Sequence, residues 1–171
     1  LAALHLRLVA IVSKRLHDAW AATDALCDRR NESDRRRHLL NVIALTVAMT
    51  RFAEEQPGPF RIIAASFAHP RHMLEPASAE RAANAYIQLI SNISEPIEAL
   101  QTDGFFSPGN AHHRAITLLT STNSLLQLEK VTRLAPQLVD AHALATGLSL
   151  TLVRGWTADG QDASVHAADL D

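Results

Sequence analysis

Nine histidines and one cysteine are the side chains with the clearest capacity for metal binding or acid–base chemistry. His69 and His72 lie three residues apart, His112 and His113 are adjacent, and His142 follows further along the chain. A zinc site needs three or four ligands that converge on one point, and neither a Cys pair nor an HExxH or ExxH pattern is present. We therefore expect structural or solvated histidines and no metal or cofactor. His112 or His142 lining a cavity is the alternative.

The sequence shows no pattern typical of nucleophilic or phosphate chemistry. It contains neither a GxSxG motif nor a glycine-rich phosphate loop, and Cys27 stands among charged residues. Asp140 and His142 are two residues apart on a predicted helix and therefore face different directions. Because one cysteine cannot form an intrachain disulfide, we interpret Cys27 as a small apolar side chain in a reducing compartment. We do not expect an enzyme.

Polar residues inside otherwise apolar helical stretches are a more informative group. They are Asn41, Thr46, Thr50, Asn84, Tyr86, Gln88, Asn92, Thr117, Thr120, Ser121, Thr122, Asn123, Ser124 and Gln127. A buried polar group costs free energy unless it is paired, so each of these could be a hydrogen-bonded core residue. Together they could instead line a cavity that is mostly apolar with a few polar groups, as small-molecule sites are.

Apolar residues at helical spacing predict six helices and no strand. The expected helices cover about residues 1–27, 33–55, 59–68, 76–102, 107–134 and 136–156. Ser33 and Ser107 are suitable N-caps, and Pro96 is expected to kink the fourth helix. The second helix is apolar nearly all round, which places it at the centre of the domain. We therefore predict one all-α domain over residues 1–156, followed by a flexible polar and acidic tail at 157–171.

The charge balance argues against a self-contained nucleic-acid-binding domain. The 171 residues carry a net charge of −2, whereas such domains carry a basic excess that neutralises phosphates. Arginines at 29–37 are interleaved with Asp28, Glu32 and Asp34, so they are interpreted as a solvated helix junction. No stretch predicts a signal peptide or a membrane span, and a cytoplasmic location is expected.

The order of these segments resembles the C-terminal region of TetR-family repressors. Residues 50–61 look like the family's segment in which a helix ends in a His/Gln-Pro turn and a Phe-Arg helix follows. Residues 103–107, Asp-Gly-Phe-Phe-Ser, look like its turn before the penultimate helix, and residues 138–156 are similar to its closing helix, which ends in Arg-Gly plus an apolar residue. The resemblance covers about residues 1–156. Leu1, which is not Met, stands where the helix after the family's helix-turn-helix unit would begin, so we expect that upstream unit to be absent here.

The resemblance implies an effector-sensing and dimerisation domain of a transcriptional repressor. DNA would be bound only through the missing N-terminal helix-turn-helix. A ligand would enter a cavity among the first five helices, and its binding would favour one separation of the two first helices in a homodimer. A helical interaction or scaffold domain without a pocket is the second hypothesis, and a helical enzyme is the third.

The expected ligand site lies between the first, second, fourth and fifth helices and is closed at one end by the third. Its residues are Leu16, Trp20, Ile43, Thr46, Thr50, Phe67, Tyr86, Ile90 and Asn123. Few charges are available there, so the ligand is expected to be neutral or weakly polar and mostly apolar. The alternative is a solid core in which Thr46 and Thr50 bond to carbonyl groups of their own helix.

Small residues on the last two helices favour close helix packing and suit a four-helix interface between two copies. The expected interface residues are Leu125, Leu128, Leu144, Ala145, Leu148, Ser149, Leu152 and Trp156. We therefore expect a homodimer that recognises a small apolar or weakly polar effector, with no membrane partner.

Overall fold

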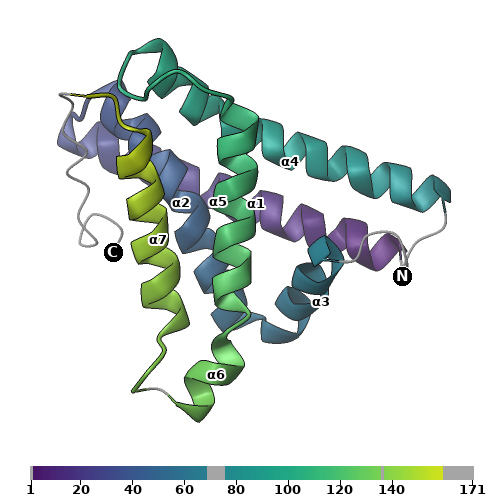
Figure 1. Ribbon diagram of the computed structural model, residues 1–171. Coiled ribbons are helices and arrows are strands. Elements are labelled where there is room, and N and C mark those ends of the chain that lie inside the picture. Colours follow the sequence, from purple (N-terminus) through teal and green to yellow (C-terminus); the bar gives the residue numbers. More distant parts are fainter. Residues whose placement is uncertain (1, 69–75, 136, 160–171) are drawn as a thin grey trace.

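The computed structural model describes residues 2–68, 76–135 and 137–159, and this part of the chain is all-α (Figure 1). Its helices are α1 (Ala2–Arg30), α2 (Asp34–Glu55), α3 (Pro57–Ala68), α4 (Pro76–Thr102), α5 (Ala111–Leu126), α6 (Glu129–Leu134) and α7 (Ala141–Trp156). The prediction of an all-α domain is therefore confirmed. The one extended pairing among the described residues is an isolated bridge between Phe106 and Thr157. Most of the expected tail, from residue 160 on, lies outside the described residues.

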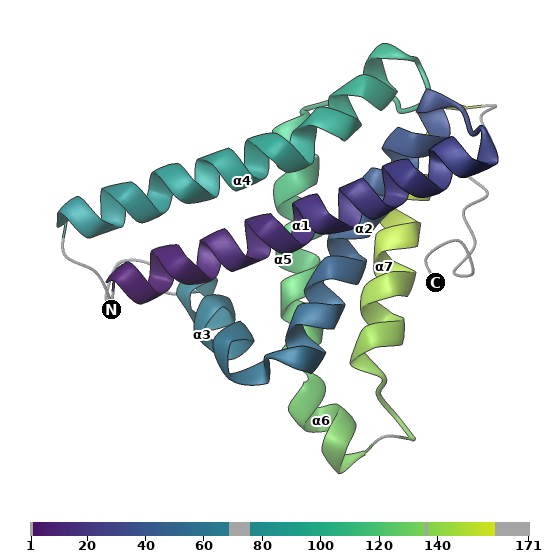
Figure 2. The ribbon, with the colours of Figure 1, turned by 180° about the vertical axis from the view of Figure 1, so that it is seen from behind.

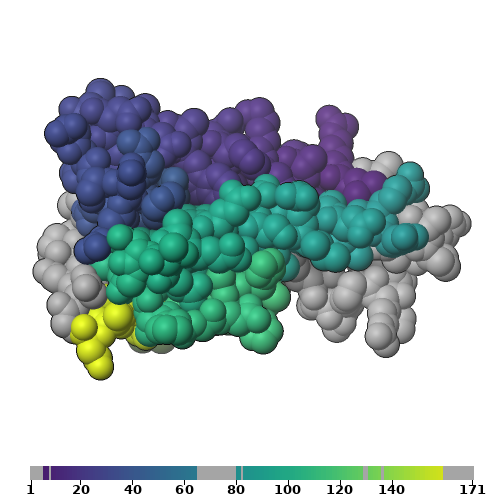
Figure 3. Space-filling model, turned by 90° about the horizontal axis from the view of Figure 1, so that it is seen from above, coloured from purple at the N-terminus to yellow at the C-terminus, as the bar shows by residue number. Residues whose placement is uncertain are grey.

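The helices form two layers. The long helices α1 and α4 lie side by side, whereas α2, α5 and α7 run across them (Figures 1 and 2). Seen from above, α1 and α4 form adjoining ridges along one face (Figure 3). The short helix α3 packs under α1, next to the end of α2. No helix among the described residues is both long and apolar enough to cross a bilayer.

Helix α2 is central because its sequence leaves it no broad polar face. It packs against α1, α3, α4, α5 and α7. The buried residues of α2 are Leu39, Leu40, Val42, Ile43, Ala44, Leu45, Thr46, Ala48, Met49, Phe52 and Ala53. At its start the Ser33 hydroxyl accepts a hydrogen bond from the Arg36 amide, so the predicted N-cap is confirmed.

The helix expected to begin after Ser107 begins instead at Ala111. The side chain of Asn110 caps it by accepting from the His113 amide at 2.9 Å. Ser107 serves a tertiary contact, because its amide donates to the Trp156 carbonyl at 2.8 Å. The same predicted helix is divided into α5 and α6, with a turn at Gln127 and Leu128.

The last helix also begins later than predicted. Asp140 is its N-cap, and the carboxylate accepts from the amides of His142 and Ala143. Leu138, which falls within the range predicted for this helix, lies before it and is 79% exposed. An aspartate at this position both satisfies free amides and carries a negative charge at the positive end of the helix dipole.

An aromatic contact fastens the end of α7 to the segment after α4. The Phe106 and Trp156 rings meet edge to face with centroids 6.0 Å apart. The Arg114 guanidinium lies over both rings and donates to the Ser107 carbonyl at 2.9 Å. Burial lowers the pKa of Arg114, yet an arginine remains charged at any physiological pH. The cation therefore acts as a permanent link between α5, α7 and the turn that precedes α5.

A second tie joins the start of α2 to the turn after α4. Arg35 Nε and the Asp103 carboxylate are 2.5 Å apart, and the guanidinium also lies over the Phe105 ring. The hydrogen bond from Arg35 lowers the pKa of Asp103. Gly104 follows with a φ of 71°, a left-handed conformation that glycine adopts without steric cost at the end of a helix.

The Cys27 thiol is fully buried near the end of α1. Burial raises the pKa of this thiol, although the nearby Arg37 acts in the opposite direction. Because the thiolate is the reactive form, a raised pKa and a buried sulfur both slow its chemistry.

We predict that Cys27 reacts with a disulfide reagent such as DTNB at least about tenfold more slowly in the folded protein than in concentrated guanidinium chloride. The measurement is the rate of thionitrobenzoate release at pH 8, with glutathione as the control for reagent activity. Equal rates in the folded and unfolded protein would contradict the burial of this thiol.

Candidate functional site

Three hydroxyl groups meet in the middle of the apolar core. Thr46 of α2 lies 2.6 Å from Ser149 of α7 and 3.4 Å from Thr122 of α5, measured between side-chain oxygens. All three residues are buried. We call these residues the hydroxyl cluster. It brings together three helices that are far apart in the sequence.

The protons of the hydroxyl cluster can be assigned by counting donors. Each hydroxyl has one proton to donate. Ser149 Oγ lies 2.9 Å from the Ala145 carbonyl, which can only accept. If Ser149 donates there, Thr46 donates to Ser149, and Thr122 is left to donate to Thr46. The result is a directed chain of hydrogen bonds, Thr122 to Thr46 to Ser149 to Ala145, in which every proton has an acceptor.

Two oxygens among the residues expected to bind ligand have no such partner. Thr50 Oγ1 and Asn123 Oδ1 are buried, and neither makes a hydrogen bond with any described group. Thr50 is one turn beyond Thr46 on α2, and Asn123 follows Thr122 on α5. Asn123 as a whole is only 4% exposed. Neither Thr46 nor Thr50 bonds to a carbonyl of its own helix, as the solid-core alternative required.

The other residues expected at the ligand site are mostly part of the packed core. Leu16 and Ile43 are fully buried. The side chains of Trp20 and Ile90 are partly buried against the same core. The indole Nε1 of Trp20 donates a hydrogen bond to the Asn41 carbonyl at 2.9 Å. Tyr86 is half-buried on α4. The side chain of Phe67, on α3, lies outside the described residues.

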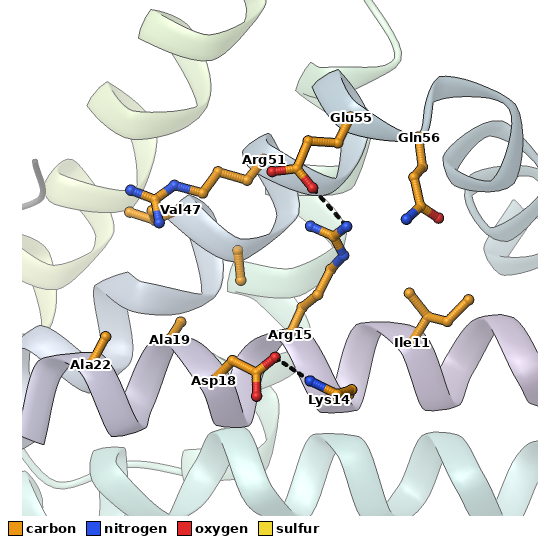
Figure 4. Close-up of a pocket in the computed structure, with 11 residues that line it drawn as sticks. Ile11, Lys14, Arg15, Asp18, Ala19, Ala22, Val47, Arg51, Glu55 and Gln56 are labelled. Atoms are coloured by element: carbon orange, nitrogen blue, oxygen red, sulfur yellow. Dashed lines mark hydrogen bonds and ion pairs between the residues drawn. The ribbon is translucent and has the colours of Figure 1, made fainter.

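The described residues form a hollow elsewhere, between α1 and α2. It has a volume of about 500 Å³ and is open to solvent (Figure 4). None of the nine residues expected to bind ligand lines it. The residues that do are Ile11, Lys14, Arg15, Asp18, Ala19, Ala22, Val47, Ala48, Arg51, Glu55 and Gln56. We call this hollow the α1–α2 cleft.

The α1–α2 cleft has charged edges. On α1, Lys14 Nζ lies 2.6 Å from the carboxylate of Asp18, one turn further along the helix. Arg15 of α1 forms an ion pair with Glu55 of α2, with Nη2 2.7 Å from Oε2. None of these four residues was expected at a site from the sequence. The sequence does place the charged and small residues of α1 three and four positions apart, a spacing that puts them on one stripe of that helix.

The residues expected at a dimer interface fall into two groups. Ala145 and Ser149 are buried inside the chain, where α7 packs on α2 and α5, so they are not available to a second copy. Leu144 is 45% exposed. Leu125, Leu128, Leu148, Leu152 and Trp156 are half-buried. The small residues of α7 therefore serve packing within the chain, while its larger apolar residues reach the surface.

Two of the described histidines pair with carboxylates. His142 Nδ1 is 2.8 Å from the Glu54 carboxylate, and His112 Nδ1 is 3.7 Å from that of Glu98. Each pairs with one carboxylate, and no group of three metal-ligating side chains occurs among the described residues. His69 and His72 lie outside the described residues.

Comparison with protein-family models, with curated proteins and with solved structures finds no match to this chain.

The paired and unpaired threonines of α2 give a direct test of this geometry. Thr46→Val removes a hydroxyl that has two partners, and we predict that it lowers the free energy of unfolding by about 1–2 kcal/mol. Thr50→Val removes a buried hydroxyl without a partner, so the free energy of unfolding should stay the same or rise by up to about 1 kcal/mol. Urea denaturation followed by circular dichroism measures both.

The matched control is Thr120→Val, because Thr120 is exposed on α5 and bonds only to carbonyls of its own helix. It should change the free energy of unfolding by less than about 0.5 kcal/mol. Equal losses of stability in Thr46→Val and Thr50→Val would show that the two hydroxyls do not differ in pairing.

Proposed function

We propose that this chain is the effector-sensing and dimerisation domain of a TetR-like transcriptional repressor. The observation that carries the proposal is the set of polar groups inside the apolar core. The hydroxyl cluster lies beside two helix positions, Thr50 and Asn123, whose buried oxygens have no partner within the described part of the chain. Structural cores pair nearly all of their buried polar atoms, whereas ligand sites combine apolar walls with a few polar groups that fix orientation.

The architecture supports this proposal through the order of the helices. A long first helix is followed by a central helix, a short helix, a second long helix and a closing pair of antiparallel segments, α5–α6 and α7 (Figure 1). This is the order that the resemblance to the repressor family implies for residues 1–156. In such a repressor the DNA-reading unit would precede α1, so a movement of α1 would move that unit.

The signal in such a domain would pass through α1. Leu16 and Trp20 anchor this helix to the core that holds the hydroxyl cluster. A ligand that binds one arrangement of the core more tightly shifts the population toward the matching position of α1, and only by its difference in affinity between the two states. In a homodimer this would change the separation of two DNA-reading units.

The alternative function is a helical protein-interaction domain without a ligand. The observation that favours it is the apolar surface near α6, where Leu134 and Leu138 are 78% and 79% exposed. Exposed leucines that gather at one end of a domain mark contact surfaces more often than leucines that are exposed singly. This candidate predicts a macromolecular partner and no effect of small molecules on stability.

A thermal-shift screen of neutral, mostly apolar compounds tests the sensor proposal. We predict compounds that raise the melting temperature by binding the folded state. Thr50→Val and Tyr86→Phe should each weaken such a compound by about fivefold to tenfold, because a hydrogen bond contributes about 1 kcal/mol. Thr120→Val is the control. A broad screen without any stabilising compound would contradict the proposal and favour the interaction domain.

The proposed dimer is tested by sedimentation. We predict a concentration-dependent monomer–dimer equilibrium in which Leu144→Arg weakens association at least about tenfold, because it places a charge on an apolar contact. The control is Ile87→Arg, which introduces the same charge at an exposed isoleucine of α4. A wild-type chain that remains monomeric at every concentration would contradict the proposed dimer.

A further inference from the structure

The α1–α2 cleft combines an apolar floor with a charged rim. Four small apolar side chains line it, Ala19 and Ala22 from α1 and Val47 and Ala48 from α2, and we call these four residues its floor. Small side chains fill less of the space between two helices than large ones do. Here a hollow of about 500 Å³ remains between α1 and α2. This volume falls within the range of small-molecule sites, about 300–1,000 Å³.

One cation of the cleft is not neutralised. Lys14 pairs with Asp18 and Arg15 pairs with Glu55, which accounts for both carboxylates among the lining residues. Arg51 makes no hydrogen bond or ion pair with any other residue that the structure describes, and it is exposed. Figure 4 shows its side chain extended alongside Val47, on the α2 wall of the cleft. The cleft therefore carries a net charge of one positive unit, located at Arg51.

We propose that the α1–α2 cleft binds a small amphipathic carboxylate. The carboxylate pairs with the guanidinium of Arg51, which offers parallel N–H donors that match two carboxylate oxygens. The apolar body of the ligand lies on the floor formed by Ala19, Ala22, Val47 and Ala48. This inference does not rest on the proposed function, because the cleft and the hydroxyl cluster use different residues.

The two carboxylates of the rim restrict the ligand to a single negative charge. Asp18 and Glu55 already have cationic partners, and a second anionic group would approach them without a free cation to neutralise it. A cationic ligand would meet Arg51 and the two paired cations. A neutral ligand would gain the apolar contact alone. Monoanions with an apolar body are therefore the class that fits.

The cleft can be tested with three probes of equal chain length. Octanoate is the monoanion, octanamide is the neutral analogue and octanedioate is the dianion. Amide chemical shifts in two-dimensional NMR spectra of the ¹⁵N-labelled protein report both the position and the affinity of each probe. We expect octanoate to shift the amides of residues 19, 22, 47, 48 and 51, and the other two probes to bind at least about tenfold more weakly.

Two pairs of variants locate the interaction. Arg51→Gln should weaken octanoate about tenfold, whereas Arg154→Gln, which removes the same charge from an exposed position on α7, should change its affinity by less than about twofold. Ala19→Leu should fill the floor and block octanoate, whereas Ala21→Leu, an exposed position of α1 outside the cleft, should not. Thr50→Val should leave octanoate binding unchanged, which separates this site from the proposed core site.

The inference is overturned by any of three results. These are no saturable shift with octanoate up to about 10 mM, equal affinities for octanoate and octanamide, or an octanoate affinity that Arg51→Gln leaves unchanged. Arg51 is exposed, so the Arg51→Gln variant is expected to fold. The dispersion of its amide spectrum verifies this before the titration.

Discussion

The burial of most of α2 is the constraint on which the rest of the structure depends. A helix that is apolar nearly all round has little surface to give to solvent, so other helices must enclose it. Five of them do so, from α1 on one side to α7 on the other. Each of these helices needs only one apolar stripe, directed at α2, and its opposite face is free to carry charge. The two-layer arrangement is the packing that satisfies all five stripes at once.

This constraint also explains why the hydroxyl cluster exists. Thr46 is buried in the middle of this helix, so a partner on a neighbouring helix offsets the cost of removing its hydroxyl from water. Ser149 supplies it from α7, and Thr122 adds a third hydroxyl from α5. Apolar contacts tolerate small rotations of a helix, whereas hydrogen bonds lose most of their strength when their geometry is disturbed. The cluster therefore sets the rotation of α5 and α7 relative to α2.

The sequence predicts the elements of this fold better than it predicts their ends. The periodic segments and the breaker at Pro57 locate six helices of at least 12 residues because those signals are local. Ser107 followed by Pro108 has the local form of a helix start, but the Ser107 amide is taken by the Trp156 carbonyl, 49 residues away. A local rule contains no information on that contact, so the cap falls on Asn110 instead.

The candidate sites show the same division. Thr46 and Asn123 could be selected from the sequence because a polar residue on an apolar helix face is visible there. The α1–α2 cleft could not, because a hollow depends on how closely Ala19 and Ala22 approach Val47 and Ala48, and their separation is a tertiary quantity. Ala145 and Ser149 were expected at a dimer interface for a related reason. Small residues indicate close packing but do not indicate which helix they pack against, and here it is the chain's own core.

The two faces of α1 give this helix an unequal attachment to α2. Leu16 and Trp20 fix one face of α1 in the core. Exposing a buried leucine to water would cost about 1.5–3 kcal/mol of free energy. The other face meets α2 through the cleft, where the Arg15–Glu55 ion pair is half in solvent and such pairs stabilise by at most about 1 kcal/mol. The cleft side of α1 is therefore held by polar contacts, namely this ion pair and the Arg15 guanidinium over the Phe52 ring. A molecule seated in the cleft would contact α1 on this polar side, away from the face that Leu16 and Trp20 fix in the core.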